Sequence, residues 1–233
     1  MIEARAAPLV YDDHGRQVFA CDAIDLTVSD SEFLGILGPS GSGKSSLLYL
    51  LCGLKTPTSG EIAFRGRALD TMTEDDRADL RLRKFGFVFQ YPYLLGYLTA
   101  LENVVVACPV SRRAQSRRSG ASQPAAMGDV ETAARELLSN LGLGEKAHRL
   151  PHELSGGEKQ RVCNPRALLG GGEVIFADEP TANLDHVNGT AVVETLVANR
   201  GQGSLVVVTH DPTMLEKADR VVTISDGRIV EGG

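Results

Sequence analysis

Residues 33–54 of this 233-residue chain read FLGILGPSGSGKSSLLYLLCGL. The apolar run from Phe33 to Leu37 is typical of a short buried strand. A loop rich in glycine and serine follows it, and the apolar segment from Ser46 to Leu54 is long enough to form a helix. The order of strand, glycine-rich loop and helix predicts that a strand end and a helix start meet around a ligand.

The loop fits the pattern G-x-x-x-x-G-K-[ST] at every fixed position from Gly38 to Ser45. In such a loop successive backbone N–H groups surround phosphate oxygens, Lys44 reaches the β and γ phosphates, and the Ser45 hydroxyl is a ligand for Mg²⁺. The positive end of the next helix attracts the same anion. The alternative, a plain Gly/Ser turn, is disfavoured by the flanking strand and helix. ATP and Mg²⁺ are therefore the predicted cofactors, and the predicted ATP-binding residues of this segment are Gly38, Pro39, Ser40, Gly41, Ser42, Gly43, Lys44, Ser45 and Ser46.

A second apolar strand, Val174 to Ala177, ends in two adjacent carboxylates, Asp178 and Glu179. Asp178 suits the shell of a Mg²⁺ ion, directly or through water. Glu179 is placed to polarise an attacking water. The alternative is an exposed acidic strand end, which is less compatible with a phosphate-binding loop elsewhere in the chain. Lys44 and Glu179 are thus predicted catalytic residues.

The rest of the chain alternates short apolar strands with helical segments, which predicts a mainly parallel sheet covered on both faces. Two strands over 10–28 surround the polar turn 12–15, and a hairpin with Asp226-Gly227 at its turn lies near the C-terminal end. Further strands are predicted at 60–65, 86–90, 174–177 and 205–209. Helices are predicted at 73–83, 99–106, from 130 onward, and at 188–199.

Residues 154–161 read LSGGEKQR and resemble the signature motif of ABC ATPases, with Glu158 where Gln is commoner. The resemblance implies that this segment begins a helix and binds the γ-phosphate of ATP held by the other subunit of a dimer. The residues so implied are Ser155, Gly156, Gly157 and Glu158.

Other family elements have counterparts in the same order. Gln90 resembles the Q-loop glutamine, which touches Mg²⁺ and the water and contacts the membrane subunit. Residues 182–185 resemble the D-loop at the dimer interface, and His210 resembles the catalytic switch histidine that contacts the γ-phosphate. Tyr11 resembles the aromatic residue that stacks on adenine, with a plain strand-edge tyrosine as the alternative. The implied metal ligands are thus Ser45, Gln90 and Asp178.

The resemblance covers essentially the whole chain. It implies an α/β P-loop NTPase fold, with a mainly parallel core sheet, an N-terminal antiparallel β subdomain and a helical subdomain over about 92–165. Residues 1–233 would then form a single ABC ATPase domain. The segments 87–90, 98–104 and 178–185 look most like the lipoprotein-release and macrolide-export group.

The implied assembly is a homodimer, or a pair with a second ATPase subunit, that holds ATP at its interface and binds integral-membrane permease subunits. We expect a cytoplasmic protein, peripheral on the inner face of the cell membrane. The formal net charge of −6 argues against nucleic acid as a partner. No apolar run approaches the roughly 20 residues that a membrane-spanning helix needs. The four cysteines are scattered, which favours buried thiols over a metal site.

Two departures from the family pattern stand out. Asn164-Pro165 occupies positions where the family has small apolar residues, and proline inside a helix costs roughly 3 kcal/mol. We therefore expect a kink or an early break of the helix near Arg161 to Asn164. The segment from Ser111 to Met127, with an Arg/Ser-rich part over 111–120, is longer and more basic than expected, and we assign it no function.

Three alternatives come from other classes. A DNA-repair ATPase of the ABC type would need a long insertion, but only 64 residues, 91 to 154, separate Gln90 from Ser155. A translation factor of this type needs two ATPase cassettes in one chain. A regulator that binds nucleotide without hydrolysing it would not need Glu179 and His210.

Overall fold

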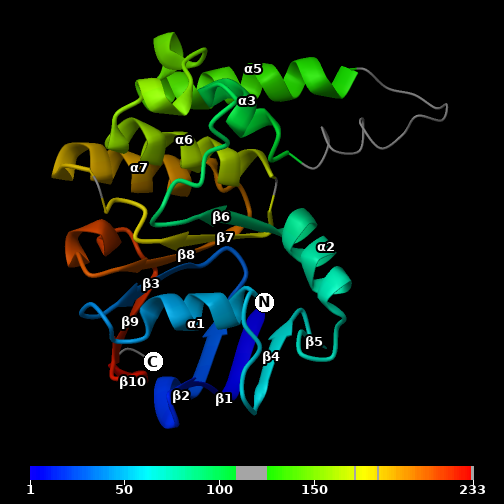
Figure 1. The fold of residues 1–233 in the computed structure, drawn as a ribbon, viewed down its shortest axis with the longest axis vertical. Helices are drawn as coiled ribbons and strands as arrows, with labels where there is room; N and C mark the ends of the chain where they lie inside the picture. Colours follow the sequence, from blue (N-terminus) through cyan, green and yellow to red (C-terminus); the bar gives the residue numbers. More distant parts are fainter. Residues whose placement is uncertain (109–124, 171, 183, 232–233) are drawn as a thin grey trace, which may run out of the picture. The chain divides into compact units, whose positions relative to one another are not determined.

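The computed structural model describes residues 1–108, 125–170, 172–182 and 184–231 (Figure 1). The segment 111–120 lies outside the described residues. The chain divides into two compact units. The first unit comprises Met1–Arg81, Phe176–Glu179 and Gln202–Gly233, and the second comprises Leu82–Ile175 and Pro180–Gly201. The predicted helical subdomain over about 92–165 stays a prediction.

An antiparallel sheet of the first unit contains four strands in the order β2-β1-β4-β5. The strands are β1 (Ile2–Asp13), β2 (Arg16–Val28), β4 (Glu61–Phe64) and β5 (Arg67–Ala68). The sheet confirms the expected antiparallel β subdomain. Strand β1 begins eight residues before the predicted start at Val10, and its pairing with β2 is interrupted by three register shifts, which hide its alternating pattern.

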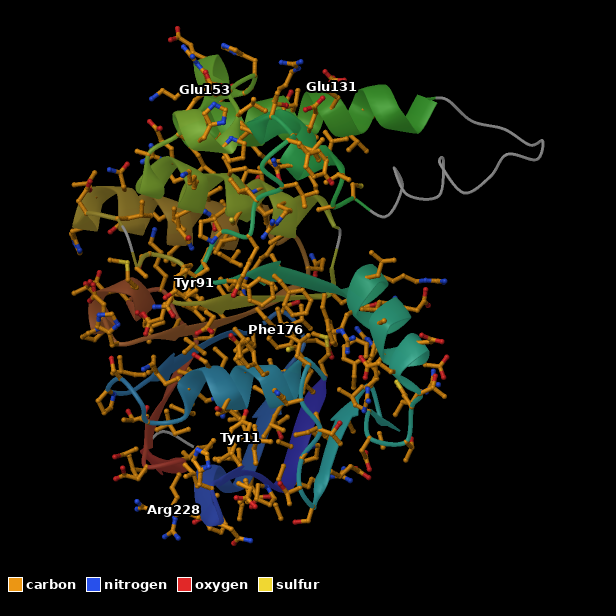
Figure 2. All side chains as sticks on the ribbon, viewed as in Figure 1. Tyr11, Tyr91, Glu131, Glu153, Phe176 and Arg228 are labelled. Carbon is orange, nitrogen blue, oxygen red and sulfur yellow. The ribbon has the colours of Figure 1, made fainter. Side chains whose placement is uncertain are left out.

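The second sheet of this unit is mainly parallel, as predicted. Its strands follow the order β10-β9-β3-β8-β7, where β3 (Phe33–Leu37) runs parallel to both β8 (Ser204–Thr209) and β9 (Arg220–Ser225). Strand β10 (Arg228–Glu231) pairs antiparallel with β9 across the predicted Asp-Gly turn. All residues of β8 and β7 (Val174–Asp178) are buried, which is why both read as continuous apolar runs. Phe176 of β7, labelled in Figure 2, is fully buried.

Helix α1 (Lys44–Leu51) lies between the two sheets of the first unit (Figure 1). It contacts β1, β2 and β8, and its four leucines are buried. Burial of these four leucines stabilises the helix in this position. The helix therefore fixes the loop before it against both sheets. Helix α2 (Glu74–Lys84) has no buried residue and starts in the first unit.

The second unit contains β6 (Phe85–Val88) and a group of helices (Figure 1). The helices are α3 (Ala100–Val105), α5 (Ala125–Asn140), α6 (Gly156–Leu169) and α7 (His186–Asn199), with the 3₁₀ turns Gly144–Lys146 and Pro151–Glu153. Helices α3, α5 and α6 share one apolar core that includes Val104, Leu138 and Val162. The helix predicted from residue 130 onward lies within α5, which supplies Ala134 and Leu138 to that core.

Helix α6 runs without interruption from Gly156 to Leu169, so the predicted early break near Arg161 to Asn164 is wrong. The predicted kink stays a prediction. Pro165 has no N–H to donate to the carbonyl oxygen of Arg161, four residues earlier. The buried Asn164 side chain donates instead, with its Nδ2 atom 3.5 Å from the carbonyl oxygens of both Gln160 and Arg161. The amide of Asn164 thus partly replaces the donor that its neighbour lacks.

Replacing Asn164 with alanine is expected to lower the free energy of unfolding by about 1 kcal/mol, because a buried carbonyl loses its donor. The Asn164→Ala change should lower the free energy of unfolding by less in a Pro165→Ala background, since the second change restores a backbone N–H. A double-mutant cycle measured by urea unfolding checks this coupling. Equal costs in both backgrounds would show that the two residues act independently.

The four cysteines are buried, and none of them forms a disulfide. Burial raises the pKa of the Cys21 and Cys52 thiols to about 12 and that of Cys163 to about 11. These three side chains therefore stay protonated at neutral pH, as expected for small apolar residues of a core. Within the described ranges, no helix is long and apolar enough to cross a membrane.

Candidate functional site

The loop Gly38–Ser45 connects β3 to α1, as the sequence predicts. Its conformation is held by short backbone contacts: Ser42 N donates to the carbonyl oxygen of Pro39 at 3.2 Å, and Ser42 O accepts from Gly227 N at 2.9 Å. Lys44 is 6% exposed, and its ammonium donates to the carbonyl oxygens of Gly38 and Pro39 at 2.8 and 2.9 Å. The loop therefore folds around the lysine that is predicted to reach the phosphates.

Two glycines of this loop stand where no side chain fits. A Cβ atom on Gly43, whose φ is +101°, would lie 2.1 Å from the carbonyl oxygen of Ala20 on β2. A Cβ atom on Gly38 would lie 2.3 Å from the carbonyl oxygen of Ile224 on β9. Gly41 also has a positive φ, +80°, but a Cβ atom there would meet nothing within 4 Å. The shape of the loop thus depends both on close packing against β2 and β9 and on the conformational freedom of its glycines.

Asp178 ends β7 in the same unit and is 2% exposed. Its Oδ1 atom accepts a hydrogen bond from Ser45 Oγ at 2.8 Å, and its Oδ2 atom accepts one from Tyr49 Oη at 3.1 Å. Burial raises the pKa of this carboxyl above its ordinary value, while the two hydrogen bonds act in the opposite direction. The structure therefore brings together the hydroxyl and the carboxylate that the sequence assigns to a metal.

Glu179 lies between the side chains of Lys44 and His210. Its Oε1 atom is 3.7 Å from Lys44 Nζ, and its Oε2 atom is 2.9 Å from His210 Nδ1. Thr209 Oγ1 donates to Oε2 at 3.3 Å. The backbone of Glu179 is left-handed, with φ +46°, and its N–H donates to the carbonyl oxygen of Val208. Such a conformation is uncommon for a residue other than glycine and is maintained here by these contacts.

The signature segment starts α6 in the second unit. Ser155 is exposed and forms a capping box: its Oγ accepts from Glu158 N at 3.3 Å, and Glu158 Oε2 accepts from Ser155 N at 2.9 Å. Glu158 also pairs with Lys146, and this hydrogen bond, more than the one from Ser155, holds the pKa of Glu158 below its ordinary range. Gly156 and Gly157 are the first two residues of α6, so their N–H groups lie at the helix end, where anions bind.

The remaining predicted residues lie as follows. Tyr11, labelled in Figure 2, is on β1, 38% exposed, with Lys55 Nζ 5.8 Å from its ring centroid. Gln90 is exposed and lies two residues beyond the end of β6, so the strand is shorter than predicted. In the predicted D-loop, Asn183 lies outside the described residues, and Asp185 caps α7 by accepting from Asn188 N at 3.0 Å. Ser40 is exposed, and Ser46 is half-buried on α1.

Sequence reasoning missed Tyr49 and Thr209, which contact the two carboxylates directly. Both lie close in sequence to a predicted site residue. Tyr49 lies four residues after Ser45 on one helix face, and Thr209 precedes His210 at the end of β8. Those spacings are the only signal in the sequence, because neither residue belongs to a recognised motif.

A family model described as ABC transporter matches residues 21–182, which include the phosphate loop, the signature segment and both carboxylates. The chain belongs to the ABC transporter family. It is an ATP-binding subunit of such a transporter, and its reaction is the hydrolysis of ATP. Its fold is therefore the P-loop NTPase fold expected from the sequence.

Several curated relatives resemble the chain over most of its length. An uncharacterized ABC transporter ATP-binding protein of Methanocaldococcus jannaschii is 39% identical over 232 residues, 99% of this chain and 98% of the relative. The lipoprotein-releasing system ATP-binding protein LolD of Aquifex aeolicus is 43% identical over 208 residues, 89% of this chain and 88% of LolD. The macrolide export ATP-binding/permease protein MacB of Wolinella succinogenes is 40% identical over 98% of this chain, which spans only 34% of MacB. These relatives confirm the predicted likeness to the lipoprotein-release and macrolide-export group.

A solved structure supports the same assignment. The dimeric ATP-binding cassette MJ0796 in a post-hydrolysis state, bound to ADP and Pi, is 31% identical to this chain, with a TM-score of 0.88 over 100% of this chain and 98% of that one.

Proposed function

We propose that two copies of this chain, or one copy and a second ATPase subunit, face each other head to tail and hold two ATP molecules between them. In each site the loop Gly38–Ser45 of one subunit surrounds the triphosphate. The exposed Ser155 hydroxyl and the N–H groups of Gly156 and Gly157 of the other subunit contact the γ-phosphate. A closed two-fold pair satisfies both sites at once. The similarity to a cassette that forms a dimer supports this arrangement.

The hydrolytic role rests above all on the placement of Glu179 between Lys44 and His210. We assign Glu179 as the general base that accepts a proton from water. The water oxygen then bonds to the γ-phosphorus, and the bond from phosphorus to the β–γ bridging oxygen breaks, which gives ADP and phosphate. His210 and Thr209 hold the carboxylate in place for this transfer. Lys44 compensates negative charge on the phosphates.

The pair formed by Ser45 and Asp178 fits a Mg²⁺ ion. Because Ser45 donates its proton to Asp178, the lone pairs of its oxygen remain available to a cation. Mg²⁺ commonly uses one or two such protein oxygens, with phosphate and water oxygens as its other ligands. When bound, the ion would neutralise charge on the β and γ phosphates. Gln90 is a further proposed contact, and Tyr11 a proposed stacking partner of adenine.

Hydrolysis removes the γ-phosphate and with it the contacts to Ser155, so the dimer is expected to separate. We propose that this opening and closing drives integral-membrane permease subunits, with the chain peripheral on the inner face of the cell membrane. The likeness to LolD and MacB supports export, or release of an envelope substrate, as the process. MacB is named as an ATP-binding/permease protein, and this chain spans only 34% of its length.

Mixing two inactive variants tests the head-to-tail site. The Lys44→Ala and Ser155→Arg variants should each be inactive alone, because every composite site then lacks one half. In an equal mixture half of the dimers are mixed, and each has one site with both halves intact. About a quarter of the wild-type phosphate release is therefore expected to return.

A matched control uses two defects in the same half of the site. A mixture of the Lys44→Ala and Asp178→Asn variants leaves no intact site in any dimer and should stay inactive. Failure of the first mixture to recover, when both chains are shown to form mixed dimers, would contradict the arrangement. Recovery in the control mixture would contradict it equally.

A further inference from the structure

Both oxygens of the buried Asp178 carboxylate are held by hydroxyl groups from one helix. Ser45 Oγ donates to Oδ1 at 2.8 Å, and Tyr49 Oη donates to Oδ2 at 3.1 Å. Asp178 is 2% exposed, so water cannot readily take the place of either donor. The carboxylate thus depends on α1 for its orientation.

The spacing of the two hydroxyls explains why they meet the same carboxylate. Ser45 and Tyr49 are four residues apart on α1 and therefore lie on one face of the helix. The phosphate-loop motif ends at Ser45, so the motif accounts for the first hydroxyl only. Tyr49 is half-buried, and its ring carries the second hydroxyl to the far oxygen of Asp178.

Two donors constrain a carboxylate more than one does. A single hydrogen bond to Oδ1 leaves the group free to turn about its Cβ–Cγ bond, whereas a second bond to Oδ2 fixes its plane. Groups that orient a ligand in this way commonly change metal affinity when they are removed, although they never touch the metal. The donor from Tyr49 is neutral, so it orients the carboxylate without cancelling its charge.

We propose that Tyr49 is a positioning residue for Mg²⁺: its hydroxyl fixes the plane of Asp178 so that Asp178 and Ser45 together present their oxygens to the ion. This inference rests on the proposed metal site of Ser45 and Asp178. It assigns Tyr49 no contact with ATP. The Mg²⁺-dependent part of ATP binding should therefore depend on the phenol hydroxyl, and the Mg²⁺-independent part should not.

Replacing Tyr49 with phenylalanine removes the hydroxyl and keeps the ring. ATP affinity of the full-length chain is measured by isothermal titration calorimetry in EDTA and over a series of MgCl₂ concentrations. The apparent dissociation constant for Mg²⁺ is expected to rise about tenfold in the Tyr49→Phe variant. The ATP affinity in EDTA should equal that of the wild type. Tyr97→Phe is the matched control, because Tyr97 is 77% exposed and should tolerate the same change without effect.

The outcomes separate this proposal from the one on which it rests. If the wild type binds ATP with equal affinity in EDTA and in Mg²⁺, the metal site itself is wrong and the role of Tyr49 is overturned with it. If the wild type depends on Mg²⁺ and Tyr49→Phe shows the same dependence, only the role of Tyr49 is overturned. A loss of affinity in EDTA as large as that in Mg²⁺ would show that Tyr49 supports the phosphate loop in general, which also overturns the proposal.

Discussion

The Glu179→Gln variant is expected to hydrolyse ATP about 10³-fold more slowly than the wild type, because an amide cannot accept the proton of the attacking water. The amide keeps the size of the carboxylate and its contacts to Thr209 and His210. Binding of ATP should survive and become tighter, since a negative charge 3.7 Å from Lys44 and close to the predicted phosphates is removed. Phosphate release and equilibrium ATP binding measure the two effects separately.

The same variant should accumulate as an ATP-bound dimer. If hydrolysis is what separates the subunits, a chain that binds ATP without cleaving it stays paired, and light scattering will detect a doubled mass in ATP but not in ADP. Glu216→Gln, an exposed position of the same unit, is the control for the loss of one negative charge. Hydrolysis at the wild-type rate by Glu179→Gln would remove this residue from the role of base.

The Gly43→Ala variant is expected to lose ATP binding, and its free energy of unfolding should fall by about 3 kcal/mol. The new methyl group would lie 2.1 Å from the carbonyl oxygen of Ala20, a backbone atom that cannot rotate away, at a φ of +101° that disfavours any side chain. The loop must therefore move off β2, and its N–H groups no longer point at a common centre. Urea unfolding and ATP titration measure the two losses.

Gly41→Ala separates strain from steric clash. Gly41 also has a positive φ, +80°, but open space lies where its Cβ atom would be. Only the conformational penalty of about 1 kcal/mol is expected there. Equal losses in both variants would show that the close approach of Gly43 to β2 contributes nothing.

The buried strands of the parallel sheet were predictable because a strand covered on both faces must be apolar throughout. Phe33–Leu37 and residues 205–209 follow that rule, and their boundaries agree with the structure within one residue. Strand β1 does not follow it, because bulges near Ala4 to Leu9 break the alternation that reveals a half-buried strand. The two-residue strand β5 is too short for any period to be seen. The continuous α6 was not predicted, because the compensation of Pro165 by Asn164 depends on a side-chain contact.

Within the candidate site, motif spacing identified the groups that the structure brings together in the first unit. Ser45 contacts Asp178, and Glu179 contacts both Lys44 and His210. The supporting contacts could not be derived, because they join residues far apart in the chain. Tyr49 and Asp178 are separated by 129 positions, and nothing in either local sequence indicates the other. The proposed roles of Ser155 and Gln90 belong to the second unit and depend on the experiments above.

The packing of the phosphate loop against β2 and β9 has a consequence for biosynthesis. Gly43 lies against Ala20, Gly38 lies against Ile224, and Ser42 O accepts a hydrogen bond from Gly227 N. Contacts between such distant positions form late, since a long stretch of chain must be ordered before they can close. While residue 227 is still inside the ribosome, the nascent chain lacks the hydrogen bond from Gly227 that supports the loop. Nucleotide capture would then require that residue 227 has left the ribosome, and cellular ATP would act as a ligand that stabilises only chains that have reached this point.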